Sequence, residues 1–291
     1  MPSVDGVIDR TPKKPETVVG ARGPLSPEQA KAVIERLGAQ SDVLQRHLAI
    51  EQEVAGTPLS VGNRTQLLHD GPETFRVMFA AMKRARRNIF LEYYIFENVE
   101  SDNMHLVDLL TKKARAGVSV AVIYDSYGSI DTPSDVFAQL QAAGVKLLGF
   151  HPLIDVGAIN DRDHRKILAV DNRTAIVGGV NLYTVYQAHP HSRLVASDGP
   201  SPDTWHDTDL KIDGPAAAEL QQVFLTHWHD EQGPPLKAVA EPAPPASGNQ
   251  AVRIIASDHN DTIPRYYATI ISAMRSAEKS IWISAAYFVP N

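Results

Sequence analysis

The sequence predicts an α/β protein, an α-β-α sandwich in which a mixed, largely parallel sheet is flanked by helices. Between residues 89 and 150, short apolar runs alternate with helical patterns, as they do in successive β-α units. The chain has 291 residues, of which 43% are hydrophobic, which is enough to enclose a substantial core. It contains no cysteine, and this excludes a disulfide framework, a zinc–thiolate site and a cysteine nucleophile.

The N-terminal part is predicted to lie outside this sandwich. Residues 1–24 combine prolines with mixed charges, and we expect a disordered tail there. Residues 25–60 are predicted to form an N-terminal helical segment, because a capping box begins at Ser26. Within that segment we expect two helices and then a loop, over residues 26–37, 42–54 and 56–63.

Residues 61–232 are predicted to form the first complete domain. Apolar runs predict strands over residues 67–68, 89–96, 118–124, 145–150, 167–170, 174–177 and 205–212. Patterns of helical period predict helices over residues 72–87, 104–116, 134–143 and 216–228. Glu92 lies inside a largely apolar strand, so we expect it either to point toward a functional site or to pair with a basic neighbour.

The C-terminal part is predicted to begin a second copy of the same arrangement. Residues 233–250 are rich in proline and are interpreted as a linker. Beyond it, residues 273–288 repeat, in order, the helix end and strand seen at residues 81–96. Residues 251–291 are therefore predicted to start a second repeat that is incomplete. Its strand, over residues 281–289, would lack sheet partners, and we expect this end to be poorly ordered or sticky.

Chemistry-bearing residues gather around a predicted hairpin, which runs from His164 through Asp171 to Asn181. Strand alternation places His164 and Lys166 on one face and Asp171 on the other. A two-residue loop would bring Gly179 and Asn181 to the His164 face, whereas a loop of odd length would not. An imidazole, an ammonium, an amide donor and a glycine suit an anionic phosphate. Taken alone, this pattern also fits a hairpin with a surface histidine and lysine.

The wider pattern resembles the phospholipase D superfamily, and bacterial cardiolipin synthases in particular. The signature comprises His164-x-Lys166, then Asp171, then Gly178-Gly179-x-Asn181. Further matches occur in order from about residue 59 to residue 228, at residues 62–64, 67–73, 91–96 and 205–215. The resemblance implies a phospholipase D-like sandwich whose second repeat is truncated in this chain.

The resemblance also implies phosphodiester exchange through a covalent phosphohistidine, without a metal or a cofactor. His164 would act as the nucleophile or as the general acid. Lys166 and Asn181, with Gly179 beside them, would bind the phosphate oxygens and stabilise the transition state. Asp207 is our candidate to accept the second imidazole N–H of His164 and so orient it.

Asp171 and the histidines outside the motif are not expected to take part in the chemistry. Asp171 belongs to the catalytic motif of the family, yet we expect it to make a salt bridge or turn hydrogen bonds behind the reactive face. No metal site is predicted. Loop histidines exposed to solvent are the preferred interpretation of His189, His191, His227 and His229.

The function predicted from this resemblance is that of a cardiolipin synthase-like phosphatidyltransferase or a phospholipid hydrolase. Its partners would be a phosphatidylglycerol-like phospholipid and an alcohol acceptor. Family members carry a His-x-Lys motif in each of two halves. The repeat places the second motif beyond Asn291, so we expect half a site here and no activity of this chain alone. The alternatives are a superfamily nuclease that completes its site as a homodimer, and a non-catalytic fragment.

Net charge and hydropathy limit the kinds of partner that the chain is expected to have. The net charge of −6 gives no support to nucleic-acid binding. No apolar run approaches the roughly 18 residues that a transmembrane helix requires. We therefore expect a cytoplasmic or peripheral-membrane location, with any membrane contact made at the surface.

Overall fold

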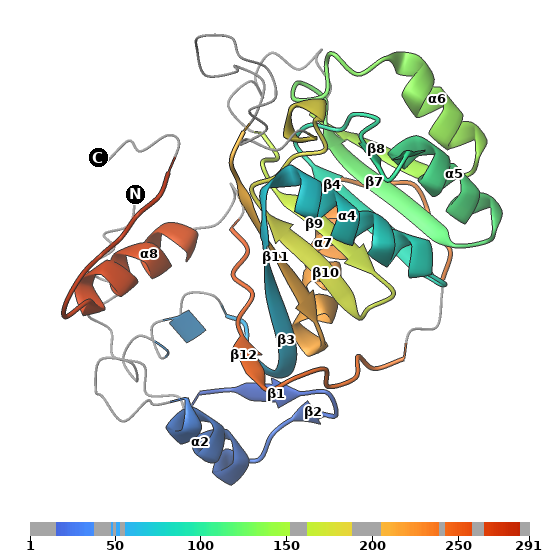
Figure 1. The fold of residues 1–291 in the computed structure, drawn as a ribbon. Coiled ribbons are helices and arrows are strands. Elements are labelled where there is room, and N and C mark those ends of the chain that lie inside the picture. Colours follow the sequence, from blue (N-terminus) through green and yellow to red (C-terminus); the bar gives the residue numbers. More distant parts are fainter. Residues whose placement is uncertain are drawn as a thin grey trace, which may run out of the picture. The chain divides into compact units, whose positions relative to one another are not determined.

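A computed structural model gives the fold (Figure 1). It describes residues 16–37, 48, 51–52, 56–151, 162–187, 205–238, 242–257 and 265–285. The chain divides into two compact units: residues 1–60 with 253–291, and residues 61–252.

The second unit is built on one mixed sheet. Its strand order is β3 (Leu59–His69), β11 (Thr208–Asp213), β10 (Thr174–Gly178), β9 (Lys166–Val170), β4 (Asn88–Tyr93), β7 (Ser119–Asp125) and β8 (Lys146–Phe150), with β12 (Gln250–Val252) also paired to β3. A separate small ribbon joins β5 (Glu100–Ser101) to β6 (Met104–His105).

The predicted α/β class and mixed sheet are confirmed, but the sheet is not largely parallel. Among the seven strands from β3 to β8, only β4, β7 and β8 pair in parallel, and the pairs from β3 through β11, β10 and β9 to β4 are antiparallel. The physical reason is the connection between β9 and β10. A tight turn can join only antiparallel neighbours, whereas a parallel pair requires a long crossover such as a helix.

Helices cover both faces of this sheet (Figure 1). They are α4 (Asp70–Arg84), α5 (Leu106–Arg115), α6 (Ser134–Ala142) and α7 (Pro215–Asp230), and a short 3-10 turn, η2, spans Thr184–Tyr186. Ile89, Leu91 and Leu168 join the core beneath α4 and α5, whereas Phe90 and Ala169 pack with Phe224 of α7. This alternation produces three layers, because successive strand residues point to opposite faces.

The first unit contains strands that the sequence analysis did not predict. Residues 16–24 were expected to belong to a disordered tail, but they include β1 (Val18–Gly20) and β2 (Gly23–Pro24), which pair antiparallel. Val18 is buried and pairs in parallel with Leu59, the first residue of β3. The loop predicted over residues 56–63 therefore ends at Pro58. Strand pairing and burial decided this segment, although its composition suggested neither.

Three predictions about helices and strands near the chain ends have different outcomes. The first helix is confirmed as α2 (Pro27–Arg36): Ser26 Oγ accepts from the amide of Gln29 at 3.3 Å, and Gln29 Oε1 accepts from the amide of Ser26 at 3.1 Å. The helix predicted over residues 42–54 lies mostly outside the described residues. After α8 (Arg265–Ser276), residues 281–285 form no strand, and Trp282 is 91% exposed. A strand needs a partner for its backbone groups, and this segment has none among the described residues.

Candidate functional site

Three side chains meet where the chain enters β9. His164 precedes the strand and has an exposed side chain, and Lys166 opens the strand with its side chain only 4% exposed. Lys166 Nζ donates to the carbonyl oxygen of His164 at 2.7 Å. The Tyr94 ring lies against both, 4.9 Å from the imidazole centroid and 5.5 Å from Lys166 Nζ. Tyr94, the residue that follows the buried strand β4, was not among the predicted site residues, because it lies in a largely apolar run.

Gly179 and Asn181 also lie near this region, but not for the reason given from strand alternation, which assumed a two-residue loop. Val170 pairs with Thr174, so three residues form the turn, and the condition of a two-residue loop fails. Gly179 lies beyond the end of β10, where a Cβ would come within 2.0 Å of Asp207 Oδ1. Glycine is therefore required for close approach to that carboxylate.

The Asn181 side chain is buried and bonded on both sides. Its Oδ1 accepts from the amide of Ile95 at 3.2 Å, and the side chain also hydrogen-bonds the hydroxyl of Tyr186. These two bonds fix the amide plane, so Asn181 is held rigidly where β4 ends. The predicted phosphate-binding role of Asn181 stays a prediction.

Asp207 belongs to the same charged group, although it precedes β11 instead of lying within a strand. Its Oδ1 accepts from the amide of Thr208 at 2.8 Å, and its Oδ2 accepts from the Tyr186 hydroxyl at 3.4 Å. Burial lowers the pKa of both His164 and Lys166, and the charge of Asp207 partly opposes that lowering. No hydrogen bond joins Asp207 to His164 in the described part of the chain, so its orienting role stays a prediction.

Burial sets the protonation states of the two central groups. Desolvation lowers the pKa of Lys166 to about 8, despite four neighbouring aspartates that favour the charged form. Desolvation and the charge of Lys166 lower the pKa of His164 below its ordinary value. The imidazole is therefore neutral at pH 7 and keeps a free lone pair, which a nucleophile requires.

Three of these four aspartates were not among the predicted site residues, namely Asp125, Asp163 and Asp209. Asp209 is only 2% exposed, accepts from the amide of Val180 at 3.1 Å, and has a pKa raised to about 7, mainly by burial. Asp125 is fully buried at the end of β7, and its carboxylate accepts from the amides of Tyr127 and Gly128 at 2.9 Å each. Its place at the carboxyl end of a parallel strand is the signal that could have identified it, because ligand sites in α/β sheets gather at such ends.

Asp171, in contrast, does not join these residues. It lies in the turn after β9, and its carboxylate accepts from three consecutive backbone amides. Those of Arg86 and Arg87 lie at 2.8 Å and 2.7 Å, and that of Asn88 lies at 3.0 Å. The carboxylate thus fixes the segment between α4 and β4.

Replacing Asp171 by alanine is expected to lower the free energy of unfolding by about 2 kcal/mol, because three amide donors lose their acceptor. Asp171→Asn, which keeps one acceptor oxygen, should lose about half as much. Urea denaturation of the three proteins measures both values. A loss below about 0.5 kcal/mol for the alanine variant would contradict the structural role, since that is the range of an ordinary surface substitution.

Glu92 and His227 lie on the opposite face of the sheet. Glu92 is fully buried, and its Oε1 accepts from Arg165 Nη1 at 3.3 Å and contacts His227 Nδ1 at 2.9 Å. The alternative in which Glu92 pairs with a basic neighbour is therefore confirmed. The prediction that His227 is exposed in a loop is wrong, because α7 extends past it and packs it against the sheet. The helical spacing of Leu220, Phe224 and Trp228 could have revealed this. His189 and His191 lie outside the described residues.

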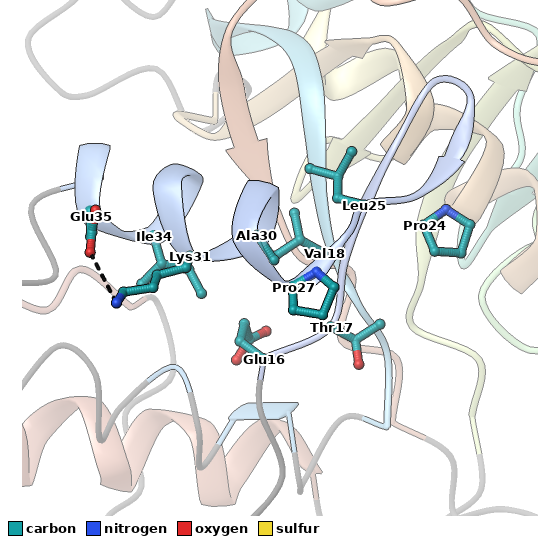
Figure 2. Close-up of a pocket in the computed structure, with 10 residues that line it drawn as sticks. All are labelled: Glu16, Thr17, Val18, Pro24, Leu25, Pro27, Ala30, Lys31, Ile34 and Glu35. Carbon is teal, nitrogen blue, oxygen red and sulfur yellow. Dashed lines mark ion pairs between the residues drawn. The ribbon is translucent and has the colours of Figure 1, made fainter.

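A cavity of about 490 Å³ lies in the first unit, apart from these residues (Figure 2). Val18, Ala30 and Ile34 give it largely apolar walls, and an ion pair between Lys31 and Glu35, 3.9 Å apart, lies beside it. Its lining carries no histidine, and its carboxylates, Thr17 and Lys31 have no imidazole beside them to form a histidine-based phosphate site. The candidate site is therefore the region around His164.

Comparison with known proteins decides the family to which this site belongs. A family model described as "Cardiolipin synthase, PLD-like domain" matches residues 78–196, which include His164, Lys166 and Asn181. Residues 78–196 match a phospholipase D-like domain. The resemblance drawn from the sequence is thereby confirmed.

Curated relatives of this phospholipase D-like chain are cardiolipin synthases. One from Alkalihalophilus pseudofirmus is 32% identical over 273 residues, covering 92% of this chain and 51% of the relative. One from Geobacillus kaustophilus is 33% identical over 253 residues, covering 84% of this chain and 48% of the relative. The chain thus spans about half the length of the curated relatives it matches.

A more distant likeness is found among solved structures. Nuc from Salmonella typhimurium, a phospholipase D family member, matches with a TM-score of 0.43 and 20% sequence identity, over 59% of this chain and 97% of that chain. A likeness at this level carries no information on activity. No helix among the described residues is long and apolar enough to cross a membrane.

Proposed function

We propose that this phospholipase D-like domain supplies one half of an active site for phosphodiester exchange on phospholipids, as in a cardiolipin synthase-like phosphatidyltransferase. The observation that carries the proposal is the juxtaposition of His164 with the buried ammonium of Lys166. Lys166 Nζ lies 2.7 Å from the His164 carbonyl oxygen, and both groups lie at the same end of β9. The cardiolipin synthase relatives support the choice of a phospholipid substrate.

In the first proposed step, the neutral imidazole of His164 attacks phosphorus and forms an N–P bond. The bond between phosphorus and the leaving alkoxide oxygen breaks, and a general acid protonates that oxygen. In the second step an acceptor alcohol, such as the headgroup hydroxyl of a second phosphatidylglycerol, attacks phosphorus, the N–P bond breaks and the imidazole is released. The conjugate base of the general acid takes the hydroxyl proton and so returns to its protonated form. Lys166 would stabilise the charge on the non-bridging oxygens throughout.

The second acid–base group is absent from this chain's own pattern, since His164 is the one histidine followed two residues later by lysine. A partner half would supply it, and with that half present His164 could serve as nucleophile or as general acid. The alkoxide leaves slowly without an acid, so this chain alone should turn over very slowly.

Trapping the covalent intermediate tests the proposal. The chain would be incubated with short-chain phosphatidylglycerol labelled at phosphorus and then quenched in alkali, which preserves phosphohistidine. We expect label on the wild-type chain and none on His164→Asn. The matched control is His105→Asn, because His105 is half exposed and pairs with Glu100, away from Lys166.

Two results would count against the assignment. Label that persists in His164→Asn would remove His164 as nucleophile, and product formation that persists in the same variant would remove it from catalysis altogether. Size-exclusion chromatography with the same assay separates the alternatives: an active homodimer would favour the nuclease-like arrangement, and an inactive monomer would fit the isolated half.

A further inference from the structure

A second cluster of polar side chains lies on the sheet face opposite His164 and Lys166. It comprises Glu92 on β4, Asp163 just before β9, and His227 on α7. One ligand-capable atom from each residue lies within 4.8 Å of the other two. All three side chains are more than nine-tenths buried, at 0%, 5% and 8% exposed. The layer between β4 and α7 therefore encloses three groups of a kind that proteins seldom bury without partners.

Each carboxylate of the cluster has one oxygen with a partner and one without. Glu92 Oε1 is bonded to Arg165 and His227, and Asp163 Oδ1 accepts from the amide of Arg165 at 3.1 Å. Glu92 Oε2 and Asp163 Oδ2 are buried and have no hydrogen-bond partner among the described residues. A buried acceptor without a donor has lost its hydrogen bonds to water without replacing them, so such atoms are rare in folded proteins.

The charges of the cluster are also unbalanced. Two carboxylates face one guanidinium, that of Arg165, whose Nη1 lies 3.3 Å from Glu92 Oε1. A proton on His227 would balance the charge, yet it would leave Glu92 Oε2 and Asp163 Oδ2 without donors. A proton on Asp163, whose pKa burial raises to about 7, is the competing way to reduce the charge. A cation placed among the three groups satisfies both requirements, because it neutralises charge and coordinates the two unpartnered oxygens.

We propose that Glu92, Asp163 and His227 form a binding site for a divalent cation, preferentially Zn²⁺. One imidazole nitrogen and two carboxylate oxygens form a ligand set suited to Zn²⁺, whereas Mg²⁺ and Ca²⁺ prefer oxygen ligands alone. Arg165, which already bonds Glu92 Oε1, acts as a neighbour that orients this carboxylate.

The proposed cation has a structural role. Strand alternation places Glu92 and Lys166 on opposite faces of the sheet, although the charge of Asp163 also favours the ammonium of Lys166. Its coordination would link α7 and β4 to Asp163, the residue next to His164, and thereby fix the position of the segment that leads into β9. No step of phosphoryl transfer passes through it. No metal site is predicted from the sequence, because these three ligands come from distant parts of the chain and no local spacing relates them.

Zinc titration of the metal-stripped chain tests the proposal. Isothermal titration calorimetry should show one Zn²⁺ bound per chain. Glu92→Gln, Asp163→Asn and His227→Gln should each weaken binding by at least about 100-fold, because removal of an outer-shell partner alone costs about 10- to 100-fold. The matched control is His229→Gln, because His229 lies two residues from His227 on the same helix and is exposed. This variant should bind Zn²⁺ like the wild type.

A second measurement covers the case in which a core variant fails to fold. X-ray absorption at the zinc edge of the wild-type complex should show nitrogen and oxygen ligands at about 2.0–2.2 Å, with a single histidine contribution. The proposal is overturned if the wild type binds no Zn²⁺, or if His229→Gln removes binding while His227→Gln retains it. A spectrum with several histidine ligands would overturn it equally, since the cluster offers one.

Discussion

Replacing Lys166 by methionine is expected to weaken the binding of tungstate to this chain about 10- to 100-fold at pH 7, which is the range for losing a hydrogen bond to a charged group. Tungstate is a tetrahedral dianion, so it matches a phosphate in shape and charge without requiring turnover. The ammonium of Lys166 is buried beside His164, where a low local dielectric strengthens its attraction for an anion. Calorimetric titration of both proteins measures the difference.

The pKa of Lys166 gives this test a second arm. Because burial lowers that pKa to about 8, the wild type should lose affinity for tungstate as the pH rises from 7 to 9. Lys166→Arg should show no such loss, because a guanidinium stays protonated throughout this range. Equal affinity of the methionine variant and the wild type at pH 7 would place the anion elsewhere and remove Lys166 from the site.

Asp209→Asn is expected to make the chain more stable at pH 8 while changing little at pH 4. Burial raises the pKa of Asp209 to about 7 in the folded state, against an ordinary value of 3.8. Below pH 4 both states carry the proton. Between about pH 4 and pH 7 the unfolded chain has released it and the folded chain has not, so the free energy of unfolding falls as the pH rises.

The size of this effect follows from the shift. At 1.36 kcal/mol per pKa unit, ionising Asp209 costs the folded state up to about 4 kcal/mol by pH 8. Asparagine is neutral, and its Oδ1 can still accept from the amide of Val180. Urea denaturation at pH 4, 6 and 8 gives the difference between the two proteins at each pH. A difference that is constant with pH would show that Asp209 titrates normally.

The elements that the sequence predicted well are those specified by local patterns. The capping box at Ser26 fixes the start of α2, and apolar periodicity marks α4, α5 and α7 to within a few residues. The strand pattern likewise places β4, β7, β8 and the β9–β10 hairpin. His164 and Lys166 could be placed together for the same reason, since two-residue alternation is a local property of an extended chain.

The features that the sequence did not predict depend on contacts between distant segments. Val18 becomes a strand residue only because it pairs with Leu59, and Tyr94 joins the site only because β4 lies beside β9. The turn after β9 has three residues, so the assumption of a two-residue loop, from which Gly179 was placed on the His164 face, fails. The buried group of Glu92, Asp163 and His227 is the extreme case, because the three residues come from separate parts of the chain and only Glu92 stands out in the sequence, inside an apolar strand.

The pairing of β3 with β11 has a consequence for folding during synthesis on the ribosome. Arg64 of β3 lies opposite Asp213 of β11, so the two strands meet only after the whole intervening chain has emerged. At about 5–20 residues per second, β3 waits on the order of 10 s without its neighbour. During that interval the edge of β3 is unpaired and can pair with other nascent chains. Slow translation and high expression should therefore both promote aggregation before β11 pairs with β3.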